Sequence, residues 1–285
     1  MTRAGSAGRE LAPGIVLLAN VVAVVSLMAG ALLAVASMVG YAAGAWTSPE
    51  ALSPGLVGAA MVGVAPALFT VGRARVWEEA RTLVLPLAVV LVGLFVVSVV
   101  NGEALWVARG GSLFLVLFSL GWVATLGALA AWAVLCLVLQ YRRPRSGPPE
   151  RAAPLPGWSK PALAVLGSGW SGIGAGLLVL PGFWSAFVPW PVNRADAQGL
   201  GVWALSLGVG VLGALAEDDL ARLRPALLAV PSVALAAGAV LAVHAPDVRW
   251  SSGPGLSLVV LLAGLLVTGV TGRMLWGRAT AERAA

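Results

Sequence analysis

Long apolar runs separated by short polar segments are the main pattern of this chain. No charged residue occurs between Glu10 and Glu50, and similar uncharged runs follow further along the sequence. Because about 20 apolar residues cross about 30 Å of hydrocarbon, such runs predict transmembrane helices. Eight spans are expected, at roughly 14–38, 55–72, 83–100, 112–139, 161–181, 199–216, 226–243 and 254–272.

Composition supports a lipid environment for these runs. Of the 285 residues, 59% are apolar and 11% are charged, which is more apolar surface than a soluble core can hide. The single cysteine, Cys136, lies inside an apolar run and excludes an internal disulfide. The sequence therefore predicts an all-α, polytopic integral membrane protein.

Basic residues are distributed unequally between alternating loops. Only Arg109, Arg194 and Arg249 of the 18 lysines and arginines fall on the side opposite the N-terminus. The positive-inside rule then places both termini in the cytoplasm. These bases lie in short loops beside the spans, which favours anionic lipid headgroups of the bilayer over nucleic acid as their partners. An Arg-, Ala- and Gly-rich composition is typical of a GC-rich bacterial genome, so the plasma membrane of a bacterium is the expected location.

Several landmarks repeat along the chain at a fixed distance. A shift of 144 positions places Trp46 on Trp190 and Trp106 on Trp250. A repeat of this kind predicts an internal duplication. The first unit would cover residues 1–140.

The second unit would cover residues 161–285, after a linker at 141–160 that reads YRRPRSGPPERAAPLPGWSK. Its basic, proline-rich composition predicts an extended segment without a packed core. Each unit contains four expected spans and returns the chain to its starting side. The two four-helix units are therefore expected to be parallel, related by an axis along the membrane normal.

A glycine run at 167–176, GSGWSGIGAG, matches the G-x-G-x-x-G spacing of dinucleotide-binding loops. Such a loop needs a strand before it and an acid about 20 residues later. The nearest downstream acid, Asp196, lies beyond the expected span. We interpret the run as part of a helix in which Ser168, Gly172 and Gly176 form a face for close helix packing.

Candidate chemistry is sparse. None of the acids falls within the expected spans, which weakens a proton-coupled pump but leaves a facilitator for a neutral solute or lipid. His244 is the only histidine and precedes Asp247 by three residues. A metal site needs more ligands, and a solvated interfacial histidine is favoured over a general base. No cofactor is indicated.

Three intramembrane side chains are the candidates for a pocket. Asn20 is a strongly polar group inside an apolar run, and Trp170 and Trp203 lie deeper than the tryptophans expected near the membrane edges. Asn20 would line a small polar cavity or form a hydrogen bond between helices. The two indoles would line the same pocket or pack between helices.

The charged loops permit one pairing hypothesis. At the 144-residue shift, Arg73 and Arg75 meet Glu217 and Asp219, so equivalent positions carry opposite charges. These loops would pair between the two units. The favoured alternative is that Asp218 or Asp219 caps the start of the seventh helix, while the segment LARLR at 220–224 faces solvent.

The segment FWSAFVPWPVNRADAQGLGVWALSLGVGVLGALAEDD, at 183–219, resembles uncharacterised actinobacterial multi-pass membrane proteins. Trp190, Pro191, Gly201 and Trp203 carry the resemblance, with a P-W-P turn where the fuller pattern is W-P-W. More loosely, each half resembles a DoxX-like four-helix membrane domain. This resemblance implies a duplicated antiparallel four-helix bundle and transfers no catalytic residues.

Three classes of function remain open from the sequence. The first is a protein that binds or passes a small apolar molecule or lipid. The second is a non-catalytic structural protein that acts through a membrane-protein partner or a homo-oligomer, which suits its small-residue helix faces. The third is a membrane enzyme that uses His244, Asp247 or a serine.

Overall fold

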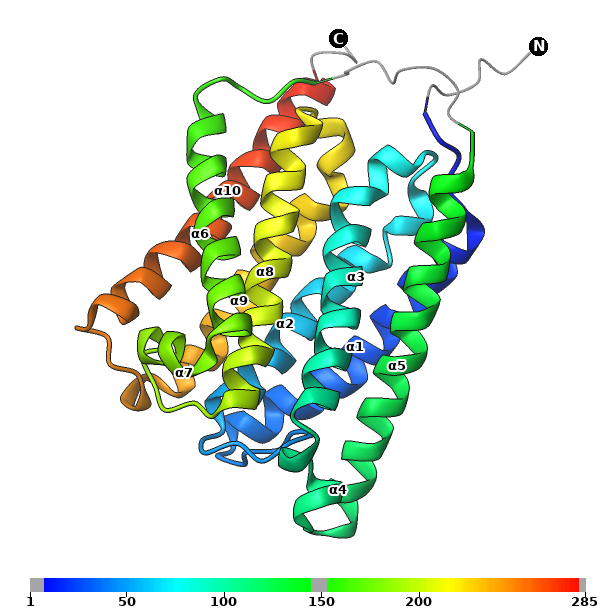
Figure 1. Cartoon of the computed structure of the whole chain (residues 1–285). Helices are drawn as coiled ribbons and strands as arrows, with labels where there is room; N and C mark the ends of the chain where they lie inside the picture. Colours follow the sequence, from blue (N-terminus) through cyan, green and yellow to red (C-terminus); the bar gives the residue numbers. More distant parts are fainter. Residues whose placement is uncertain (1–7, 145–152, 282–285) are drawn as a thin grey trace.

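Eight long helices dominate the computed structural model, which describes residues 8–144 and 153–281 (Figure 1). All eight are long and apolar enough to cross a membrane. They are α1 Pro13–Met38, α2 Leu52–Leu68, α3 Trp77–Val100, α5 Leu113–Arg142, α6 Ser159–Val179, α8 Arg194–Glu217, α9 Arg224–Val243 and α10 Gly253–Ala281; the short α4 (Trp106–Arg109) and α7 (Pro181–Trp184) lie in loops. The expected all-α, polytopic fold with eight spans is confirmed.

Several helices begin earlier than the apolar pattern predicts. α3 starts at Trp77 instead of 83, with two glutamates in its first turn, where carboxylates favour the positive end of the helix dipole. α8 starts at Arg194 instead of 199, because the Asn193 side chain caps it by accepting the N–H of Asp196 at 2.8 Å. Asp196 is therefore a buried residue of a helix end, whereas the sequence placed it beyond the span.

The glycine run lies within α6, as interpreted, but the packing face differs from the expected one. Ser168 and Gly172 are exposed, and a Cβ at Gly172 would meet nothing within 4 Å. Gly174 instead presses on the backbone of α8, where a Cβ would collide with the Leu205 amide and lie 2.8 Å from the Gly201 carbonyl oxygen. The spacing of four residues was correct for close packing in general, but it did not identify which side of α6 meets its neighbour.

The same close approach occurs between α1 and α2. A Cβ at Gly30 would lie 2.8 Å from the Gly58 carbonyl oxygen, and a Cβ at Gly58 would lie 2.6 Å from the Gly30 carbonyl oxygen. Gly174 lies 144 positions after Gly30 in the chain. Both halves therefore begin with a helix pair joined through small residues.

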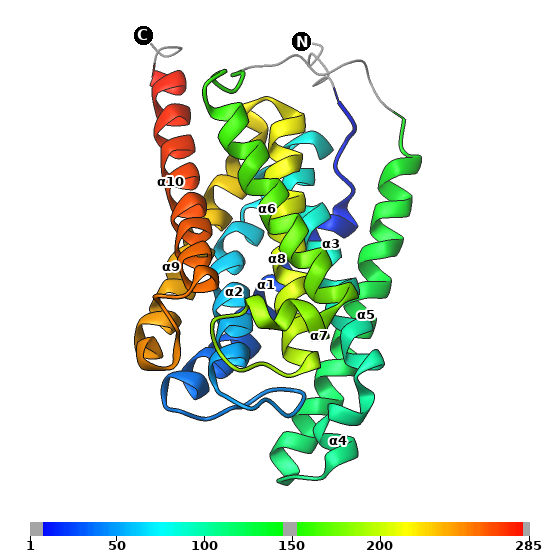
Figure 2. The same ribbon diagram turned by 60° about the vertical axis from the view of Figure 1, so that its left-hand side comes forward.

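The two halves interlock through exchanged partners. α2 packs on α9 of the other half, and α8 packs on α3. α5 and α10 pack on α3 and α9 and lie at opposite edges of the bundle (Figures 1 and 2). Internal duplication with two parallel units stays a prediction.

Two of the repeated tryptophans join the halves at the end of the bundle where α4 lies. The Trp46 indole N–H donates to the Asp196 Oδ1 atom at 2.8 Å, and the Trp190 indole N–H donates to the Ser53 Oγ atom at 2.9 Å. Each indole thus reaches a side chain near the start of a helix in the opposite half. Trp46 and Trp190 therefore lie within the interface between halves, where each donates a buried hydrogen bond.

The segment between the halves is shorter than predicted, since α5 runs to Arg142 and α6 starts at Ser159. Residues 145–152 lie outside the described part. Ala153 and Leu155 are buried against Leu220 and Leu223. This last part of the linker therefore packs on the bundle.

Candidate functional site

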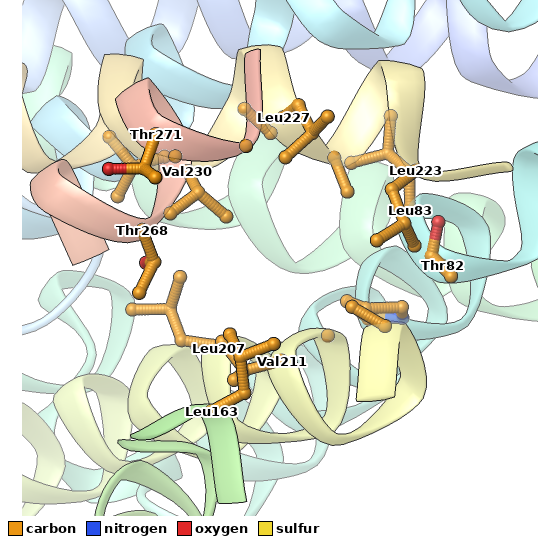
Figure 3. Close-up of a pocket in the computed structure, with 18 of the residues that line it drawn as sticks. Thr82, Leu83, Leu163, Leu207, Val211, Leu223, Leu227, Val230, Thr268 and Thr271 are labelled. Atoms are coloured by element: carbon orange, nitrogen blue, oxygen red, sulfur yellow. The ribbon is translucent and has the colours of Figure 1, made fainter. Parts of the chain in front are cut away.

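An apolar cavity of about 230 Å³ lies between α3, α6, α8, α9 and α10 (Figure 3). Figure 3 shows Leu207 and Val211 on one wall and Leu223 and Leu227 on the opposite wall, with open space between them. The cavity occupies the half of the bundle nearer to the first and last described residues, because Leu155 and Leu275 also line it. We call it the inner cavity.

The helices around the inner cavity pack as two close pairs. α6 packs mainly on α8, and α10 packs mainly on α9. α10 meets α9 closely because Gly269 and Gly272 lack side chains; a Cβ at either position would lie 2.5 Å from an atom of Pro231 or Leu227, respectively. Leu163 of α6 and Thr268 of α10 lie on the cavity wall.

Two buried polar atoms in the cavity lining have no partner within the described residues. They are the Thr82 hydroxyl oxygen and the Trp203 indole nitrogen. The two side chains are 4% and 8% exposed. Buried polar groups are nearly always hydrogen-bonded, and leaving one without a partner costs about 1–3 kcal/mol. One hydroxyl and one indole N–H of the lining side chains are therefore left without a hydrogen-bond partner by the residues that the structure describes.

A proline in α3 adds an acceptor near the same place. Pro86 has no backbone N–H, so the Thr82 carbonyl loses the donor that an α-helix would supply. The Ser206 hydroxyl of α8 donates to the Pro86 carbonyl oxygen at 2.9 Å, which fixes α8 against the proline. Both Thr82 and Pro86 line the inner cavity.

A second apolar cavity, of about 150 Å³, lies toward the opposite end of the bundle. We call it the outer cavity. Its lining includes Trp170 and Trp190, and it shares Trp203, Leu207 and Val233 with the inner cavity. The Trp170 indole nitrogen also lacks a partner in the part of the chain described. The Trp203 side chain therefore lies where the two cavities meet.

The three candidate pocket residues separate into two groups. Trp170 and Trp203 line the outer cavity together. Asn20 is half-buried in α1, lines neither cavity, and makes no hydrogen bond within the described ranges. Sequence reasoning missed Thr82, because a threonine in an apolar helix is common. The one signal in the sequence is that Thr82 lies four residues before Pro86, within the same helix.

A second polar group joins α9 to α1. The Ser37 Oγ atom lies 3.0 Å from His244 Nε2, and His244 Nδ1 lies 2.9 Å from Asp247 Oδ2. His244 is 8% exposed, so the expected solvated histidine is wrong: this histidine is held between two helices. The order serine, histidine, aspartate is that of a catalytic triad.

The arrangement does not provide a nucleophile. Ser37 is fully buried, and a Cβ at Gly55 would collide with its hydroxyl oxygen, so no substrate carbonyl fits beside that atom. Nucleophilic catalysis needs a reacting atom about 3 Å from the hydroxyl. We interpret Ser37, His244 and Asp247 as a buried hydrogen-bond group that fixes α9 to α1. The nearby Glu50 has a raised pKa, first because of burial and second because of the Asp247 carboxylate.

The charged loops pair with different partners from those expected. Glu217 forms ion pairs with Arg81 of the first half and with Arg222. Asp219 accepts the backbone N–H of Ala221 at 3.0 Å and so caps the turn before α9. Capping is confirmed, but the expectation that residues 220–224 face solvent is wrong, because Leu220, Arg222 and Leu223 are buried. Among the described residues, Arg73 and Arg75 form no ion pair with Glu217 or Asp219.

No metal site emerges within the described residues, where no group of three or more His, Cys, Asp or Glu side chains comes together. No protein-family model, curated protein or solved structure matches this chain.

Proposed function

We propose that this membrane protein binds a small, mainly apolar molecule or part of a lipid in the inner cavity. The observation that supports this function is a mainly apolar cavity whose lining residues include Thr82 and Trp203, each with a buried polar atom that no described residue bonds. Ligand sites commonly combine an apolar wall with a few polar groups. The ligand is expected to carry one hydrogen-bonding group, such as a hydroxyl or carbonyl.

The size of the cavity limits the ligand further. Pockets for drug-sized ligands have volumes of about 300–1,000 Å³, whereas this cavity measures about 230 Å³. A small molecule fits entirely, and a longer chain fits only in part. Since Trp203 also lines the outer cavity, rotation of this indole would join the two cavities and let an apolar molecule pass through the bundle.

Native mass spectrometry of protein extracted gently from its own membrane tests this function. We expect a defined small molecule or lipid to remain bound to the wild type and to be lost from Thr82→Val and Trp203→Phe, which remove the polar atoms and keep most of the volume. Trp132→Phe is the control, because Trp132 lines neither cavity. Retention of the same species by the Thr82 and Trp203 variants would contradict the proposal.

A co-purifying protein with no bound small molecule would favour the alternative, a structural role through a membrane-protein partner or homo-oligomer. A membrane enzyme ranks last, because the Ser37 hydroxyl is enclosed.

The proposed location is the plasma membrane of a bacterium, with both termini in the cytoplasm. The start of α1 and the end of α10 lie at the same end of the bundle, and α4, which ends at Arg109, and the start of α8 at Arg194 lie toward the other end (Figure 1). The positive-inside rule supports this orientation. Reporter fusions at each terminus test it, since a reporter active only in the periplasm should stay inactive at both positions. The DoxX-like and actinobacterial resemblances also stay proposals.

A further inference from the structure

A polar pocket of about 320 Å³ lies at the end of the bundle that holds both described chain ends. Three arginines from distant parts of the chain line it: Arg73 follows α2, Arg224 begins α9, and Arg273 lies near the end of α10. Glu79 is the one acidic side chain in the lining. Three guanidinium charges against one carboxylate leave two uncompensated positive charges around one pocket.

Several other bases at the same end have acidic partners. Arg81 and Arg222 pair with Glu217, Lys160 pairs with Asp218, and Arg143 lies 3.8 Å from Glu10. Arg73, Arg224 and Arg273 form no ion pair with any residue that the structure describes. The positive-inside rule explains why bases occur on this side, but it does not explain why three unpaired arginines converge on one pocket.

One of the three arginines is held in place by an aromatic ring. The Arg224 guanidinium carbon lies 5.5 Å from the centre of the Trp276 ring, and Trp276 also lines the pocket. Such stacking orders a guanidinium while leaving its N–H groups free for an anion. Like charges held close together repel, and a bound anion removes this cost.

We propose that this pocket binds a phosphate monoester group. A phosphate monoester carries a charge of about −1.5 to −2 at neutral pH, which balances the two excess positive charges. Arginine forks bind phosphate oxygens through paired hydrogen bonds. The group belongs either to the headgroup of a lipid such as phosphatidate or to a soluble phosphorylated molecule. Leu227 alone lines both this pocket and the inner cavity, so the site does not depend on the proposed function of that cavity.

The test compares two double variants that remove the same charge. Arg73→Gln/Arg273→Gln removes two arginines of the pocket, and Arg75→Gln/Arg278→Gln removes two exposed arginines that do not line it. Inorganic phosphate is titrated against each protein by calorimetry at constant ionic strength set with chloride. In parallel, native mass spectrometry measures retention of phosphatidate over phosphatidylcholine from mixed nanodiscs.

We expect the pocket variant to lose at least about tenfold in affinity for one of these ligands, because charge-assisted hydrogen bonds are lost, and the control variant to keep the wild-type value. Binding of inorganic phosphate would indicate a soluble source. Selective retention of phosphatidate without phosphate binding would indicate a lipid headgroup. Equal behaviour of both double variants, or no preference by the wild type for either ligand, would overturn the site. The single variants Arg273→Gln and Arg278→Gln repeat the comparison if a double variant does not fold.

Discussion

Asp196 illustrates at the scale of single residues how a buried carboxylate is held at the end of a membrane helix. Its Oδ1 atom accepts hydrogen bonds from the Trp46 indole at 2.8 Å and the Ser48 hydroxyl at 2.7 Å. Both donors come from the loop between α1 and α2 in the other half. A carboxylate that is 2% exposed needs such donors, because removing one leaves a charged group less satisfied.

Replacing Trp46 by Phe therefore has a predictable effect on stability. We expect Trp46→Phe to lower the free energy of unfolding by about 1.5–3 kcal/mol, the usual range for a hydrogen bond to a charged group. Trp106→Phe is the control, because the Trp106 indole nitrogen is buried without a partner in the described ranges. Reversible denaturation in detergent measures both, and an equal loss in the two variants would argue against a role for the Asp196 bond.

Glu50 carries a second residue-scale prediction, on pH. Its pKa is raised above the usual value of 4.5, mainly by burial and then by Asp247, while His244 acts in the opposite direction. The folded protein thus holds this proton more tightly than the unfolded chain. The ionised carboxylate destabilises the fold above the raised pKa, and this cost disappears as pH falls to 4.5 and below.

We therefore expect Glu50→Gln to melt at a higher temperature than the wild type at neutral pH, with the difference shrinking as the pH is lowered toward 4.5. Thermal melting across this pH range measures the effect. Glu103→Gln, which changes an exposed acid, provides the comparison. A melting difference for Glu50→Gln that stays constant with pH would show that its titration does not affect folding.

The sequence could not reveal these residue environments. His244 and Ser37 are separated by 207 positions, and Asp196 and Trp46 by 150, so no local pattern indicates that they meet. Hydropathy placed Asp196 outside the membrane helices because it reports average polarity and not hydrogen-bond partners. Trp170 and Trp203 were expected at a pocket from their depth alone, whereas the place of Thr82 in the cavity lining depends on packing between five helices.

At the scale of elements, the helices were predictable because lipid requires long apolar segments. The exact ends of the helices, and the helix faces that pack together, were less predictable. Capping by Asn193 extends α8 into polar sequence, and small residues on more than one side of α6 allow several packing faces. The structure selects the face that carries Gly174, where α8 lies close enough to touch the backbone.

A matched pair of glycine variants tests that choice of face. Gly174→Ala is expected to destabilise the protein by about 1–3 kcal/mol, because the new methyl group would overlap the backbone of α8 at Leu205. Gly172→Ala fills open space and is expected to be neutral or slightly stabilising, since alanine is the better helix former. Denaturation of both variants gives the comparison. A larger loss for Gly172→Ala would favour the face predicted from the sequence.

At the scale of the whole molecule, the exchanged contacts between halves determine how the chain assembles. α2 and α8 each lie between helices of both halves, with α2 against α1 and α9, and α8 against α6 and α3. Neither half alone would cover these two helices on both sides. The two four-helix units expected from the sequence therefore do not enclose separate cores, and the folded core is shared between the two halves of the chain.

This shared core predicts how the protein responds to being divided. Fragments 1–144 and 153–285, co-expressed as separate chains, are expected to associate and to purify together through a tag on one of them, because the α2–α9 and α3–α8 contacts do not need a covalent link. The first fragment expressed alone would leave Gly63 and Gly93 without their partners Val233 and Val202, and the second fragment alone would leave these two valines uncovered. Those fragments are expected to aggregate or be degraded. Membrane-inserted fragments that stay monomeric and melt at the temperature of the intact protein would show instead that each half folds as an independent unit.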